Sequence, residues 1–153
     1  MSVKTSKRTK TLKRPESIVN NSPRTFMDSD FPVGTTAHQG DLIFVRIASM
    51  PTSAKKRNQR QLAEGNTQGS RHILGVGNAF DCNADEVVAL IKSVCRKAEV
   101  TARYIGPVFT GDCDKADVTH PEHGHHYFRG SMIIATVYQR NVDAEEREQQ
   151  VRD

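Results

Sequence analysis

The strongest constraint on the fold is that the apolar residues are grouped in short segments, most of them typical of β-strands. The clearest segment runs from Asp41 to Ala48, where β-branched and aromatic residues follow one another. In an extended chain its side chains alternate between two faces, with Leu42, Phe44 and Arg46 on one and Ile43, Val45 and Ile47 on the other. The pattern predicts a strand that is buried on at least one side.

Helical periodicity is confined to residues 84–98, where apolar side chains recur at steps of three and four residues. Asp81 or Asn83 can cap the start of this helix. Acidic residues occupy its first turn and basic residues lie near its end, as the helix dipole favours. The segment predicts one amphipathic helix whose apolar stripe covers one side or end of a β-sheet.

Further strands are expected where β-branched residues lie between turn signals. They are predicted at residues 61–64, 71–76, 102–109, 115–119 and 131–139. The chain then has six to seven short strands with one inserted helix, so its fold class is mainly β (α+β). A small β-barrel or sandwich is the economical architecture, because closure protects the edges of so short a sheet. This β-rich globular domain is expected to span residues 39–142.

The basic charge of the chain is concentrated at its N-terminus. Residues 1–30 carry seven Lys and Arg against three Asp and Glu, a balance of +4 that equals the charge of the whole chain, so the remaining residues are neutral. A segment with so few apolar residues cannot fold alone. Residues 1–38 are therefore predicted to form an extended basic arm, and residues 143–153 a charged C-terminal tail.

A second basic cluster lies in residues 50–60, which are predicted to form a long exposed loop. The arm and this loop are the expected partner-binding segments. Their basic residues are Lys4, Lys7, Arg8, Lys10, Lys13, Arg14, Arg24, Lys55, Lys56, Arg57 and Arg60.

Four of the six histidines lie within residues 120–126. If they bound zinc, only two or three could converge from an extended segment, and His72 or His38 would have to complete the site. The alternative ligand set is His72, His120, His123 and His125. However, the spacing matches no zinc-enzyme signature. The preferred interpretation is a turn between two strands, with histidines that bond to the backbone or face water, so no metal or other cofactor is expected.

The sequence contains no recognisable catalytic motif. The three cysteines, Cys82, Cys95 and Cys113, form no CxxC pair, and no nucleophile elbow or phosphate-binding loop is present. Free thiols suit a reducing cytoplasm, where they most often act as small half-buried hydrophobes. Asp112-Cys113-Asp114 is predicted to be a solvated loop. The chain is therefore expected not to be an enzyme.

Several short motifs occur in a characteristic order: Gln39-Gly-Asp-Leu-Ile43, Leu62-Ala-Glu-Gly65, Gln68-Gly-Ser-Arg-His72, His120-Pro-Glu-His-Gly124, and Gly130 through Val137-Tyr-Gln-Arg140. In these patches the chain resembles a family of small, mostly uncharacterised bacterial and phage-encoded proteins. The resemblance implies a compact β-fold and a phage or bacterial origin, and it supplies no reaction. Where that family often has a GHxH sequence, this chain has Gly69-Ser-Arg-His72, so one possible ligand is absent.

Three functions are compatible with these features. The preferred one is a structural or interaction protein, most specifically a minor phage virion component such as a capsid decoration or cement protein. It would be made in the host cytoplasm, and its many copies would sit on a capsid shell, with the arm ordering on neighbouring subunits. The alternatives are a nucleic-acid-binding protein that contacts phosphates through the arm and residues 55–60, and a metal-dependent enzyme at the histidines. No membrane partner is expected, because no apolar run approaches the ~20 residues of a membrane span.

Overall fold

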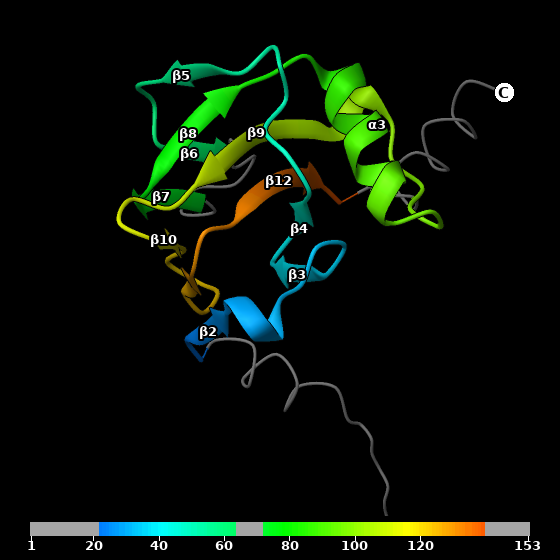
Figure 1. Cartoon of the computed structure of the whole chain (residues 1–153). Helices are drawn as coiled ribbons and strands as arrows, with labels where there is room; N and C mark the ends of the chain where they lie inside the picture. The colour runs from blue at the N-terminus through cyan, green and yellow to red at the C-terminus, as the bar shows by residue number, and fades with distance from the viewer. Residues whose placement is uncertain (1–21, 64–71, 140–153) are drawn as a thin grey trace, which may run out of the picture.

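The computed structural model of the chain describes residues 22–63 and 72–139 (Figure 1). Its elements, in order, are β2 (Arg24–Met27), the 3-10 helix η2 (Asp28–Asp30), β3 (Thr36–Gln39), β4 (Leu42–Ile47), β5 (Lys55–Arg57), β6 (Gln61–Ala63), β7 (His72–Val76), β8 (Asn78–Asp81), α3 (Ala84–Val94), the 3-10 helix η3 (Ala102–Tyr104), β9 (Ile105–Thr110), β10 (Lys115–Thr119), β11 (His126–Arg129) and β12 (Ile133–Tyr138). None of the helices in the described ranges is long and apolar enough to cross a membrane.

The described strands form two sheets. The five-stranded sheet has the order β2-β11-β10-β7-β6, and the six-stranded sheet has the order β3-β4-β12-β9-β8-β5. The predicted mainly β fold with one α-helix is thereby confirmed as a sandwich-like arrangement rather than a closed barrel. The predicted number of six to seven strands is too low, because the short strands were not recognised. These are β2, β3, β5, β8 and β11, each of three or four residues.

Two hydrophobic cores lie on the two faces of the six-stranded sheet. Leu42 and Phe44 of β4 are fully buried in the core that includes residues of the five-stranded sheet, whereas Val45 and Ile47 pack in a second core with residues of α3. In Figure 1, α3 lies next to β9 and β12. Strand β4 is therefore buried on both faces, in agreement with its continuous apolar sequence.

The segment before Gln39 belongs to the globular domain and does not form an arm. Strand β2 pairs in parallel with β11, and β3 pairs with β4. Phe31 is 1% exposed, and its ring centroid lies 5.5 Å from that of Phe128. The predicted boundary at residue 38 is therefore wrong for residues 22–38, because their few large apolar side chains complete the core between the sheets.

Arg46 fastens this N-terminal segment to β4. Its guanidinium donates hydrogen bonds to the carboxylate of Asp28 and, at 2.9 Å, to the carbonyl oxygen of Phe31. A half-buried arginine is stabilised by such partners, since an unpaired charge that is partly removed from water is costly. The rest of the predicted arm, residues 1–21, and the predicted tail, residues 143–153, lie outside the described residues.

The helix begins as the sequence predicts, because the side chain of Asn83 accepts a hydrogen bond from the backbone N–H of Glu86. It ends at Val94 rather than at residue 98. The backbone leaves the helical conformation at Cys95, with φ of −140° and ψ of 80°. This early end allows Val100, which is 6% exposed, to return to the core beneath the helix.

Residues 50–60 do not form a free loop, contrary to the prediction. Strand β5 pairs with β8. The hydroxyl groups of Thr52 and Ser53 each donate a 2.6 Å hydrogen bond to the carboxylate of Glu86 at the start of α3. These bonds, first that of Ser53 and then that of Thr52, lower the pKa of Glu86 to about 2. The segment is thus anchored to both the sheet and the helix.

The turn between β9 and β10 takes the chain from one sheet to the other. Cys113 and Asp114 have φ of 51° and 62°, and Asp112 and Lys115 exchange two backbone hydrogen bonds across them. Positive φ at both central residues is the signature of a type I′ turn, for which Asn-Gly is the preferred sequence. Cys113 is exposed at this turn, so the expectation of half-buried cysteines holds only for Cys82 and Cys95.

Replacing Cys113 with Asn and Asp114 with Gly should raise the free energy of unfolding by about 1 kcal/mol, because Asn and Gly adopt the left-handed backbone conformation of this turn at a lower energetic cost. Urea unfolding followed by circular dichroism measures this change. A Cys113→Val variant should lower the free energy of unfolding, since a β-branched residue disfavours positive φ. Equal stability of the two variants would contradict the turn type.

Candidate functional site

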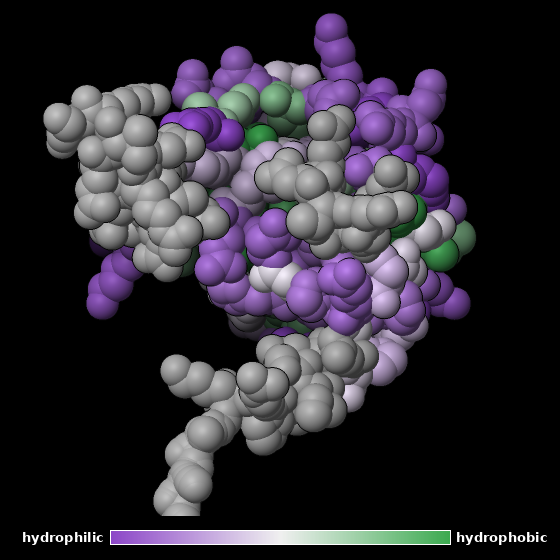
Figure 2. Space-filling view, turned by 180° about the vertical axis from the view of Figure 1, so that it is seen from behind, coloured by the Kyte–Doolittle hydropathy of each residue, from purple (hydrophilic) through white to green (hydrophobic). Residues whose placement is uncertain are grey.

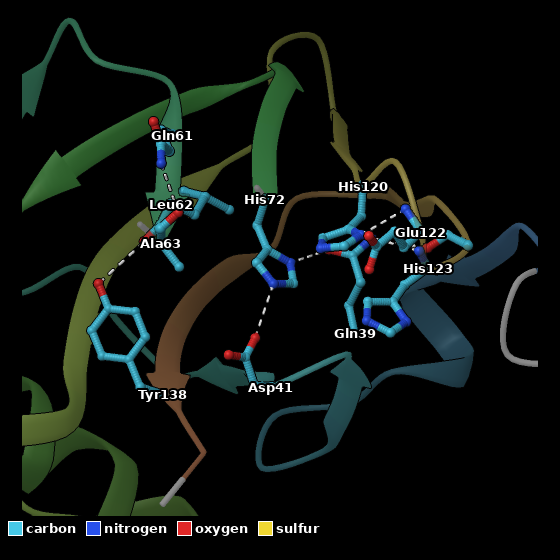
Figure 3. A network of polar contacts seen from close by, with 11 residues as sticks. Gln39, Asp41, Gln61, Leu62, Ala63, His72, His120, Glu122, His123 and Tyr138 are labelled. Carbon is cyan, nitrogen blue, oxygen red and sulfur yellow. Dashed lines mark hydrogen bonds and ion pairs between the residues drawn. The ribbon is translucent and has the colours of Figure 1, made fainter. Parts of the chain in front are cut away.

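Three motif segments that are distant in the sequence meet at one end of the sandwich (Figure 3). They are the β3–β4 turn with Gln39 and Asp41, the first residue of β7, His72, and the turn of residues 120–124. Figure 3 shows the side chains of His72, Gln39, His120 and His123 arranged next to one another, with Asp41 on the far side of His72. We refer to these five residues as the polar network.

Gln39 is the centre of the polar network. Its side chain is 1% exposed, and its Nε2 donates hydrogen bonds to the carbonyl oxygens of Val118 at 3.1 Å and Gly124 at 2.9 Å. Because both amide protons are used, Oε1 must face the Nδ1 of His72, 2.9 Å away. This one amide therefore joins β3 of the six-stranded sheet to three points of the other half of the sandwich.

The amide of Gln39 also determines the tautomer of His72. Since Oε1 only accepts, Nδ1 of His72 carries a proton, and Nε2 points at Oδ1 of Asp41, 3.2 Å away. Burial lowers the pKa of His72, while the hydrogen bond and charge of Asp41 act in the opposite direction. A second proton on Nε2 would be shared with Asp41, so His72 keeps all its hydrogen bonds when it is protonated.

His120 has the opposite tautomer. Its Nδ1 accepts hydrogen bonds from the backbone N–H groups of Glu122 and His123, both at 3.0 Å, so the neutral ring carries its proton on Nε2. The side chain thus closes the turn that follows it, as an Asx side chain does. Burial, followed by the nearby His72 and His123, lowers the pKa of His120 to about 4.

His126 forms a second connection between the sheets. This residue of β11 is 2% exposed, and its Nε2 lies 2.9 Å from the carbonyl oxygen of His38 in β3. Its Nδ1 lies 3.1 Å from the carbonyl oxygen of Gly124. Burial is the main cause that lowers the pKa of His126. The predicted backbone bonding of the histidine-rich stretch is confirmed for His120 and His126.

The structure brings together only part of the alternative metal-ligand set. The ring centroids of His72 and His120, and of His120 and His123, are each 4.5 Å apart, but the ring of His125 stacks on Tyr127 instead. Within residues 22–63 and 72–139, no group of three or more His, Cys, Asp or Glu is placed to hold a metal ion. The neutral tautomer of His120 also leaves it without a free lone pair for a metal.

A family model described as Domain of unknown function (DUF8820) matches residues 38–131. The chain belongs to this family. The DUF8820 match includes every residue of the polar network, and it leaves out β2 and β12, which nevertheless complete the two sheets. No curated protein and no solved structure matches the chain.

The basic residues predicted to bind a partner are dispersed in the structure. Lys4, Lys7, Arg8, Lys10, Lys13 and Arg14 lie outside the described residues. Lys55 and Lys56 are exposed on the edge strand β5, and Arg24 is exposed on β2. In contrast, Arg57 forms an ion pair with Asp81 at 3.2 Å, and Arg60 donates to the carbonyl oxygens of Gly75 and Gly77, each at 3.2 Å.

The Gln39-Gly40-Asp41 motif was noticed in the sequence, but no role was predicted for its residues. Gly40 has a φ of +60°, and a Cβ atom there would come within 2.6 Å of the ring of His123. The position therefore requires glycine for both conformation and space. A glycine between two polar residues, just before a strand, was the signal for a tight turn that presents buried side chains.

Replacing Gln39 with Leu should lower the free energy of unfolding by roughly 2–4 kcal/mol, because it leaves two carbonyl groups and one imidazole N–H buried without partners. Chemical denaturation measures this loss. Gln139→Leu is the matched control, since Gln139 is exposed at the end of β12 and should tolerate the same change. Similar stabilities of the two variants would show that the Gln39 amide does not hold the sheets together.

Proposed function

We propose that this DUF8820 protein is a non-catalytic structural or interaction protein, most specifically a minor component of a phage particle such as a capsid decoration or cement protein. On this proposal it is made in the host cytoplasm and is present in many copies in the virion. The phage origin rests on the sequence resemblance. The chemical part of the proposal rests on Gln39 and His120 of the polar network and on the neighbouring His126, whose side chains are bonded to the backbone of their own chain.

The observation that carries the proposal is the outer face of the five-stranded sheet. Along β10 and β11 alternate residues point into the core, and the intervening Asp117, Tyr127 and Arg129 are half-exposed on the other face. Arg129 pairs with Asp117 at 2.7 Å, and its guanidinium lies 5.4 Å from the centroid of the Tyr127 ring. Tyrosine and arginine are enriched at the energetic centres of protein interfaces.

The described surface offers little apolar area for docking elsewhere. In the view from behind, Figure 2 shows mainly hydrophilic residues with small hydrophobic patches. Among the described residues, the exposed large hydrophobic side chains are Met27, Val33 and Val76. Contact with an assembly would therefore rest on the Tyr127–Arg129 face together with the basic residues predicted for the arm that precede residue 22.

Tyr127→Ala should weaken association with particles at least about tenfold, because it removes the aromatic centre of the proposed contact face. The assay adds purified protein to phage particles that lack this gene product and measures bound protein after sedimentation. Tyr127→Phe, which keeps the ring, and Lys92→Ala, on the exposed side of α3, should bind as the unmodified chain does. If Tyr127→Ala binds as well as these controls, the contact face is wrong.

Deleting residues 2–21 should leave a folded domain, since β2 and the Arg46–Asp28 contact are kept, but should abolish association with particles. A full-length variant with Gln at Lys4, Lys7, Arg8, Lys10, Lys13 and Arg14 tests charge without changing length. Mass spectrometry of purified particles establishes whether the protein is present at all, and its absence would overturn the proposal. Binding to phage DNA that falls steeply with salt, without particle association, would favour the nucleic-acid alternative.

A further inference from the structure

We propose that the turn His120–Gly124 is a proton-operated latch that opens on mild acidification and releases β3 from the five-stranded sheet. The latch is a property of the fold and does not depend on the proposed function. It consists of the His120 ring, the two backbone N–H groups that it accepts, and the Gly124 carbonyl group that binds Gln39. The latch is sensitive to protons because Nδ1 of His120 can accept these N–H groups only while it carries no proton.

The three buried histidines differ in what a second proton would do to them. A proton on Nε2 of His72 is taken up by Asp41, and a proton added to His126 is taken up by a carbonyl oxygen, since both its ring nitrogens face one. In both residues the hydrogen bonds survive. The second proton of His120 must go to Nδ1, which is the atom that accepts the N–H groups of Glu122 and His123. Of these three histidines, His120 is therefore the one whose protonation breaks hydrogen bonds of the fold.

The surroundings of His120 increase this effect. It faces His72 from β7, His123 from its own turn and His125 from the segment before β11, each of which adds repulsion when charged. The carboxylate of Asp41, from the β3–β4 turn, acts in the opposite direction and raises the pKa of His120. In acid, His72 can take up a second proton on Nε2, next to Asp41. If His120 is also protonated, two charged rings lie next to each other, with their centroids 4.5 Å apart.

Opening of this turn would also break hydrogen bonds that connect the two sheets. Gly124 provides one of the two carbonyl acceptors of Gln39, and it also faces Nδ1 of His126. When the turn opens, both connections of β3 to the five-stranded sheet lose a partner. The ring of His123, which lies against Gly40 in the β3–β4 turn, would leave at the same time.

The sign of the pH dependence follows from linkage. The pKa of His120 is about 4 in the closed turn, below its ordinary value of 6.5, so the open turn binds more protons between these values. The closed turn is therefore fully stable above pH 6.5 and loses stability as the pH falls toward 4. Between about pH 7 and pH 5 the population of the open turn should rise about twentyfold.

Hydrogen exchange of the Glu122 and His123 amides, measured by NMR at about pH 7 and pH 5 and corrected for intrinsic rates, reports this opening. The full chain should lose about twentyfold protection at these two amides, and the amides of β3 should follow in part. His120→Asn is the matched control. Its Oδ1 can accept the same two N–H groups without titrating, so its protection should be independent of pH.

If His120→Asn loses as much protection between about pH 7 and pH 5 as the unmodified chain does, the proposal is wrong. The two proteins contain the same other histidines, so the loss would then not come from His120. A second measurement does not depend on any variant. The 15N chemical shifts of the His120 ring at neutral pH should show a proton on Nε2 and none on Nδ1. A proton on Nδ1 would rule out the latch, even if the Asn variant fails to fold.

Discussion

The sandwich depends on one buried amide whose two ends cannot be exchanged. The side-chain nitrogen of Gln39 faces two carbonyl oxygens, so its side-chain oxygen must face His72. The orientation of this amide therefore determines which nitrogen of His72 carries the proton. Inside a protein such a chain of hydrogen bonds is strong when complete and costly when one member is missing. The site is therefore a joint with a single arrangement, and its polar residues contribute to the specificity of the fold.

Local features of the fold could be predicted from the sequence because neighbouring residues determine them. The apolar residues 42–47 predicted a strand buried on at least one side, and Asp81 or Asn83 was expected to cap the helix, which Asn83 does. The N-terminal segment was misjudged because its average composition is polar, although Phe26 and Phe31 attach it to the core. Arg46 was a missed signal: an arginine on the inward face of a buried strand requires acceptors from elsewhere, and residues 28–31 provide them.

The candidate site was predictable only in part. Pro121 and Gly124 indicated a turn, and the density of histidines made backbone bonding a reasonable expectation, which His120 and His126 fulfil. The partners of Gln39 lie 79 and 85 residues away, so no local pattern could reveal them. The motifs noted in the sequence include the residues of the polar network, but their common location depends on the pairing of strands across the two sheets.

A histidine-rich segment is usually considered first as a metal site, and the hydrogen bonds of His120 argue against metal binding by that residue. A ligand needs a lone pair that faces open space, whereas the lone pair of His120 is used by its own turn. The hydrogen bonds also explain how three imidazoles, those of His72, His120 and His126, can be buried in this domain. The Nδ1 of His120 accepts two N–H groups, whereas the ring nitrogens of His72 and His126 face only oxygen atoms. An imidazole suits both surroundings, because each of its nitrogens can either donate or accept.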